Sequence, residues 1–245
     1  MAELELSTLF MLAGAAFVGS TLSGFLGMGG GIFLLTVLFL CGLEPALAIP
    51  IHALVQLSSN STRAVLFRKD VRWSAWWIFA LCALPFPVLG LAIATWLDPE
   101  QTKVLIGCLV IFATWKPKGW KIGWGERPAF AAVGVVAGTL GVVVGATGPL
   151  IAPFFLREGW RKEEIIATKA ACQVFIHVQK IVAFGAVGFS FADELPHVVP
   201  LAAAVILGTW CGKKILSRLS EARFRTAYRA VLTGLALRLI ATPWT

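Results

Sequence analysis

The chain contains a series of apolar stretches, many of them about 20 residues long, separated by short charged segments. A helix of about 20 residues crosses the roughly 30 Å hydrocarbon core of a bilayer. Backbone groups in lipid must be hydrogen-bonded within the protein, so repeated stretches of this kind fold as membrane helices. With 58% hydrophobic and 14% charged residues, the composition agrees and excludes a soluble enzyme. The sequence predicts an all-α polytopic membrane protein.

Charged residues divide the chain into ten apolar segments, five on each side of a polar linker. The first five cover 6–26, 30–42, 45–67, 73–96 and 100–115, and the second five cover 128–146, 149–157, 163–188, 195–216 and 221–240. We therefore expect a first membrane repeat over 1–115, a cytoplasmic linker over 116–127 and a second membrane repeat over 128–245.

The distribution of charge predicts the orientation of the chain. Basic residues cluster at 68–72, in the linker and at 213–225, and the positive-inside rule places all three clusters in the cytoplasm. Acidic residues such as Glu3, Asp98 and Asp193 then lie outside, and both termini are expected to be extracytoplasmic. Five segments per half make the second half enter from the side opposite to the first. The result is an inverted-topology repeat, which is typical of secondary transporters.

Each half is expected to open with a helix hairpin broken by glycine. The returning arm at 149–157 would be only about 14 Å long as a helix, too short to span, which favours a re-entrant hairpin followed by three transmembrane helices. Broken backbone at membrane depth is tolerated where it is buried or lines a cavity, and amide groups at the start of a helix bind anions. Close helix packing through small residues is the alternative. The candidate anion-binding residues in the two breaks are Gly27, Gly29, Gly30, Gly31, Gly145, Thr147 and Gly148.

Two of the long segments carry a polar stripe at equivalent positions. Both stripes have the spacing i, i+4, i+8, i+11, which at 100° per residue confines each set to about 80° of one helix face. Such a face does not point at lipid. The alternative is that the stripes hydrogen-bond neighbouring helices, while Arg63 and Lys180 snorkel from helix ends to the membrane surface. The stripes are His52, Gln56, Asn60 and Arg63 in the first half and Lys169, Gln173, His177 and Lys180 in the second.

The charges within the segments are cationic. All 13 carboxylates lie in loops or near segment ends, whereas His52, Lys169 and His177 lie well inside segments. An unpaired charge in a membrane is costly, so we expect an anionic substrate to pair with these cations. The alternative is that Lys169 is neutral. The candidate substrate-binding residues of the stripes are His52, Gln56, Asn60, Lys169, Gln173 and His177. Proton or sodium is the possible coupling ion, and histidine or lysine would carry a proton. The five cysteines are scattered without a CxxC pair, and no metal, cofactor or nucleic-acid partner is predicted.

Three sequence features resemble the TauE/SafE family of sulfite and sulfonate exporters, also called the toluenesulfonate uptake permease family. They are Gly-Phe-Leu-Gly-Met-Gly-Gly-Gly at 24–31, Gly-Leu-Glu-Pro-Ala-Leu-Ala at 42–48 and a degenerate second copy of the glycine segment after the linker. The resemblance covers nearly the whole chain. It implies two homologous halves and the movement of small sulfur-containing anions across bacterial inner membranes.

The predicted function is alternating-access transport, as an exporter, of a small sulfur-containing anion such as a sulfonate or sulfite. The protein's partners would be this anion and the lipid bilayer. An anion channel is the first alternative, and an assembly factor that transports nothing is another. An intramembrane hydrolase using Ser23 with His52 or His177 is a third, although serine in a glycine-rich helix more often serves packing. No catalytic residue is predicted.

Overall fold

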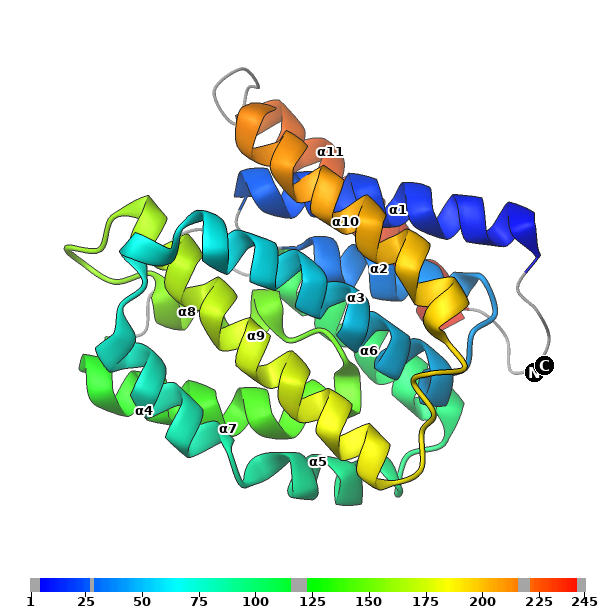
Figure 1. Ribbon diagram of the computed structural model, residues 1–245, viewed down its shortest axis with the longest axis horizontal. Helices are drawn as coiled ribbons and strands as arrows, with labels where there is room; N and C mark the ends of the chain where they lie inside the picture. The colour runs from blue at the N-terminus through cyan, green and yellow to red at the C-terminus, as the bar shows by residue number, and fades with distance from the viewer. Residues whose placement is uncertain (1–4, 27–28, 116–122, 216–220, 242–245) are drawn as a thin grey trace.

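Every regular element in the computed structural model is a helix within the described residues, which are 5–26, 29–115, 123–215 and 221–241 (Figure 1). The first half contains α1 (Leu6–Leu26), α2 (Gly30–Leu40), α3 (Pro45–Leu66), a 3-10 turn (Arg68–Asp70), α4 (Trp73–Ala83), α5 (Phe86–Ala94) and α6 (Pro99–Trp115). The second half contains α7 (Glu126–Val144), α8 (Gly148–Phe155), α9 (Lys162–Ala186), α10 (Leu195–Ile215) and α11 (Glu221–Ala241). Helices occupy all ten predicted segments, so the all-α prediction is confirmed.

The predicted continuous segment 73–96 is wrong in one respect, because it forms two helices. α4 ends at Ala83 and α5 begins at Phe86, with a bend of 49° between them. Pro85 lies at the bend. Proline has no amide hydrogen to donate and clashes with the preceding turn, which ends or kinks a helix even inside an apolar stretch.

Four of the described helices are long and apolar enough to cross a membrane, namely α1, α7, α9 and α10, and the bent α4–α5 pair makes a fifth. The polar stripe lowers the hydropathy of α3, which has 22 residues, and α6 has only 17. The two arms that return after the glycine breaks are short, 11 residues in α2 and 8 in α8. The predicted shortness of the returning arm in the second half is confirmed by the length of α8, and α2 is short as well.

The two helices with polar stripes, α3 and α9, lie side by side at the centre of the molecule and run in opposite directions (Figure 1). α1 packs along α10 on one side of them, and α7 packs along α4 and α5 on the other. Glycines allow the close approaches: a methyl group on Gly24 would meet the backbone of Gly212, and one on Gly138 would meet the carbonyl of Ala83. The central pair is therefore shielded from lipid on both flanks.

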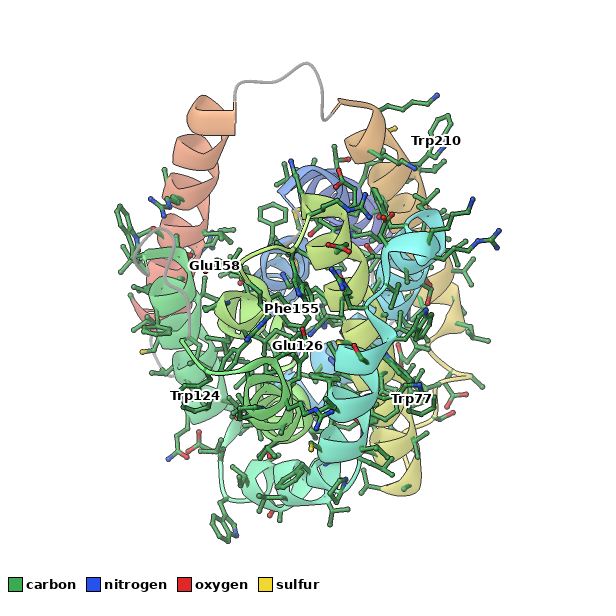
Figure 2. All side chains as sticks on the ribbon, turned by 90° about the vertical axis from the view of Figure 1, so that its left-hand side faces the viewer. Trp77, Trp124, Glu126, Phe155, Glu158 and Trp210 are labelled. Carbon is green, nitrogen blue, oxygen red and sulfur yellow. The ribbon has the colours of Figure 1, made fainter. Side chains whose placement is uncertain are left out.

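Large apolar side chains are found both inside the bundle and on its outer surface. Phe79, Phe130 and Phe155 are fully buried between α4, α7 and α8. Trp77 and Trp210 are exposed and point outward (Figure 2). Exposed aromatic and aliphatic side chains on several helices are expected for a protein whose outer surface contacts lipid and the membrane interface. The structure thus agrees with a multi-pass membrane protein.

Candidate functional site

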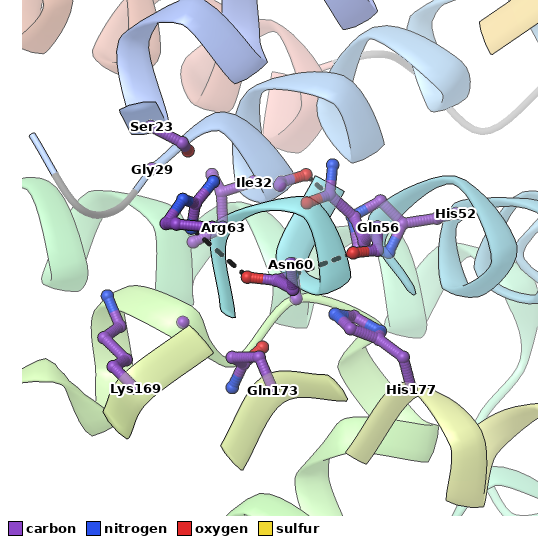
Figure 3. Close-up of a pocket in the computed structure, with 13 residues that line it drawn as sticks. Ser23, Gly29, Ile32, His52, Gln56, Asn60, Arg63, Lys169, Gln173 and His177 are labelled. Carbon is purple, nitrogen blue, oxygen red and sulfur yellow. Dashed lines mark hydrogen bonds between the residues drawn. The ribbon is translucent and has the colours of Figure 1, made fainter. Parts of the chain in front are cut away.

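A polar cavity lies between α3 and α9, where the short helices α2 and α8 begin (Figure 3). Its volume is about 30 Å³. The 13 residues that line it are Ser23 of α1, Gly29, Gly31 and Ile32 at the start of α2, His52, Gln56, Asn60 and Arg63 of α3, Ala146 and Gly148 at the second break, and Lys169, Gln173 and His177 of α9. The two glycine breaks and the two polar stripes therefore meet in one place.

The stripes face each other across this cavity. Lys169, Gln173 and His177 project from α9 toward α3 (Figure 3). Because the helices are antiparallel, His52 near the start of α3 faces His177, and their ring centroids are 6.0 Å apart in an edge-to-face arrangement. Lys169 lies at the other end of the cavity, toward Arg63.

The first break is held by α1 and α3. Gly29 has φ 102°, a left-handed conformation that glycine adopts without strain, and it turns the chain into α2. The Gly30 amide donates to Ser23 Oγ at 2.7 Å. His52 Nε2 donates to the Gly31 carbonyl at 2.9 Å. These contacts hold the start of α2 at the edge of the cavity.

The second break is held by α9. Gly145 has φ 71°, and its carbonyl accepts a hydrogen bond of 2.6 Å from Lys180 Nζ. Gln173 Nε2 donates to Thr147 Oγ1 at 3.4 Å. Two members of the α9 stripe thus position the residues that lead into α8.

The cations of the site are buried in protein. Arg63 is 5% exposed, Lys169 4% and Lys180 1%. Arg63 Nη1 donates to Asn60 Oδ1 at 3.2 Å and Nη2 to Ser59 Oγ at 3.4 Å, while its Nε has no partner among the described atoms. The alternative in which Arg63 and Lys180 snorkel from helix ends is therefore wrong, because the neighbouring helices cover both side chains.

The electrostatic environment of the cavity favours negative charge. Among its described lining residues there is no aspartate or glutamate. The N-terminal ends of α2 and α8, where helix dipoles are positive, both lie at the cavity. A buried site of amide groups, imidazoles and cations suits a ligand that only accepts hydrogen bonds.

Nine of the predicted site residues line the cavity, namely Gly29, Gly31, His52, Gln56, Asn60, Gly148, Lys169, Gln173 and His177. Gly30, Gly145 and Thr147 lie beside it and make the hydrogen bonds that hold the two breaks. Gly27 lies outside the described residues. The sequence analysis missed Ser23, Ile32, Arg63 and Ala146 as lining residues. Arg63 is the fourth member of the first stripe, so the stripe spacing could have identified it as a lining residue.

The structure offers no support for a serine–histidine pair. Ser23 Oγ is engaged by the Gly30 amide, and His52 Nε2 by the Gly31 carbonyl. Within the described chain neither His52 nor His177 hydrogen-bonds a serine hydroxyl, and no group of three metal-ligating side chains occurs.

Apolar helices arranged around a buried, cationic polar cavity define a multi-pass membrane protein with an internal polar cavity. A family model described as Sulfite exporter TauE/SafE matches residues 11–239. This match covers nearly the whole chain, so the protein belongs to the TauE/SafE family of transporters, and the resemblance seen in the sequence is confirmed. No curated protein and no solved structure matches the chain.

Proposed function

We propose that this protein is a secondary transporter that exports a compact sulfur-containing anion, such as sulfite or a small sulfonate, across the cell inner membrane by alternating access. The observation that carries the proposal is the cavity itself. Two half-length helices begin there, two long helices supply cations and amides, and its described lining contains no carboxylate. Family membership supports the transporter class and a sulfur oxyanion as cargo.

Several hydrogen-bond donors at the cavity suit such an anion. The start of α8 supplies at most the Gly148 amide, because Pro149 has no N–H and the next two amides donate to the Thr147 carbonyl. Arg63 offers an Nε–H that has no partner among the described atoms. Gln56 and Gln173 add neutral donors from opposite walls. Hydrogen bonds between charged donors and an oxyanion are shorter and stronger than those between neutral groups.

The size of the cavity favours a compact cargo. A volume of about 30 Å³ is room for about two water-sized groups. An aryl sulfonate would require the walls to separate much further than sulfite would. We therefore propose sulfite, or a sulfonate with a small substituent, over toluenesulfonate.

The packing of the helices supports an inverted repeat. α1 of the first half packs on α10 of the second, while α7 of the second packs on α4 and α5 of the first. A two-fold axis between the antiparallel helices α3 and α9 would produce this exchange, with His52 facing His177. We infer two repeats, 1–115 and 128–245, which rock against each other around the central site to give alternating access.

Ion pairs between loops support the proposed orientation. Arg72 Nε lies 2.9 Å from Glu164 Oε1, and Arg161 Nη2 lies 2.7 Å from Asp70 Oδ1. Each pair joins the segment 68–72 of the first half to the segment 161–164 of the second, as expected if both lie on the same side of the membrane. We propose from the positive-inside rule that this side is the cytoplasm, with the linker inside and both termini outside the cell.

A matched pair of lysine substitutions on α9 tests the proposed function. We expect Lys169→Met to weaken sulfite binding at least about tenfold, because a cation is lost from the cavity wall. Lys162→Met, in the exposed first turn of the same helix, should bind sulfite like the parent. Calorimetry on the purified protein measures both. Equal affinity in the two variants would contradict the proposal.

Flux measurements in proteoliposomes separate a transporter from a channel. Alternating access predicts that unlabelled sulfite on the far side accelerates the exchange of labelled sulfite, since the loaded site returns faster than the empty one. A sulfite current that rises in proportion to concentration, without such acceleration, would establish the channel instead.

A further inference from the structure

Two histidines form a buried pair in the wall of the cavity. His52 is 1% exposed and His177 2% exposed, and the rings meet edge to face with centroids 6.0 Å apart. Both side chains line the cavity (Figure 3). In each of them Nδ1 is buried and has no hydrogen-bond partner among the described atoms. Groups of this kind in a native structure require an explanation.

The hydrogen bond of His52 fixes where its proton lies. The partner of Nε2 is the Gly31 carbonyl, which can only accept, so Nε2 carries the hydrogen. Nδ1 of neutral His52 is therefore a buried acceptor without a donor, and protonation would convert it into a donor. Imidazole is the side chain whose charge changes most readily near neutral pH. The pair thus offers an atom that can bind a proton beside the proposed anion site.

Among the residues that the structure describes, the charges near the pair are all positive. Lys180 acts electrostatically on both imidazoles, and Lys169 and Arg63 line the cavity further along. The neighbouring helices α2, α5 and α8 contain no titratable side chain. The titratable residues of α4, α6, α7 and α10 do not line the cavity. An added proton therefore meets repulsion from these described charges, and a bound anion would offset that repulsion.

We propose that the His52–His177 pair binds one proton together with the anion, so that the transported unit is the anion plus a proton. This inference rests on the proposed function, because it takes the cavity to be the anion site. One proton is the capacity of the pair, since two adjacent imidazolium rings would repel each other beside the lysines. Sodium would instead add a cation that these acceptors are poorly suited to bind. Linkage requires that proton and anion strengthen each other's binding equally.

Proton counting during sulfite binding tests the proposal. Calorimetric titrations near pH 7, in buffers that differ in ionisation enthalpy, give the number of protons taken up per sulfite bound. We expect the parent to take up about one proton more than the double variant His52→Gln/His177→Gln, by one-site linkage. Protons taken up by sulfite itself are common to both proteins and cancel. The sulfite affinity of the parent should fall by up to about tenfold more per unit rise in pH than that of the double variant.

The third histidine provides a matched control. His197 lies outside the cavity at the start of α10, with Nδ1 3.0 Å from Glu194 Oε2. His197→Gln should show the same proton count as the parent. Equal counts in the parent and the double variant would overturn the proposal and leave the anion site intact. Failure of the parent to bind sulfite at any pH would instead remove the proposed function.

A measurement on the parent alone covers the case in which the double variant does not fold. With imidazole carbons labelled, nuclear magnetic resonance follows all three histidines of the chain. Saturating sulfite should raise the pH at which the signals of His52 and His177 titrate, while the His197 signal should titrate as before. An unchanged titration of both cavity histidines would overturn the proposal.

Discussion

The two glycine breaks look alike in sequence but are held in different ways. At the first, backbone packs directly on backbone, and a methyl group on Gly30 would collide with the carbonyl of Gly19. At the second, Gly148 has open space where a methyl group would be, and the break is held by the Lys180 hydrogen bond to Gly145. Close backbone packing thus adds to the Ser23 and His52 hydrogen bonds at the first break, whereas a lysine from another helix holds the second.

Residues at equivalent positions of the two stripes also have different roles. Arg63 and Lys180 occupy the same position of the repeated spacing, yet Arg63 lines the cavity whereas Lys180 hydrogen-bonds the backbone beside it. A repeated pattern therefore does not assign the same role to both copies. Three substitutions test the comparison, beginning with the largest expected effect.

Gly30→Ala should destabilise the protein by about 3 kcal/mol, because the added methyl group overpacks rigid backbone. Thermal unfolding of the purified protein in detergent measures the effect. Gly14→Ala is the matched control on α1, since a methyl group there meets no atom within 4 Å. Equal melting temperatures of the two variants would show that the first break is not fixed by close packing.

Lys180→Met should cost about 2 kcal/mol of stability, because it leaves the Gly145 carbonyl buried without its donor. The same unfolding measurement applies, with the exposed Lys162→Met as control. A snorkelling lysine would tolerate this change. A melting temperature equal to that of the control would therefore contradict the structural role given to Lys180.

Gly148→Ala should change stability by less than about 0.5 kcal/mol, because the methyl group enters open space. It should nevertheless weaken sulfite binding about threefold to tenfold, since it keeps the anion from the Gly148 amide at the start of α8. Calorimetry measures the affinity. Unchanged affinity would move the anion site away from this helix.

Much of the fold was predictable because it depends on local properties of the chain. The start of α3 at Pro45 follows from a proline in the first turn, a position that proline favours. The bend at Pro85 also had a local signal, but the apolar run that continues through it hid the break. Hydropathy reports whether a segment is apolar and does not report whether its helix is straight.

The sequence predicted many of the residues that line the cavity, but it did not predict how they are arranged in space. The spacing of His52, Gln56 and Asn60 places them on one helix face whatever surrounds that helix. The participation of Ser23 depended on how closely α1 approaches α2, which the sequence does not specify.

The sequence by itself determined that the chain forms membrane helices, where glycine interrupts them and which polar residues share a face. These properties follow from hydropathy, backbone freedom and helical periodicity along one segment at a time. Only the tertiary structure decided that the two stripes face each other, that His52 meets His177 and that Lys180 holds the second break. Periodicity fixes an angle around one helix axis, whereas a contact between helices depends on the distance and direction of a second axis, which packing sets.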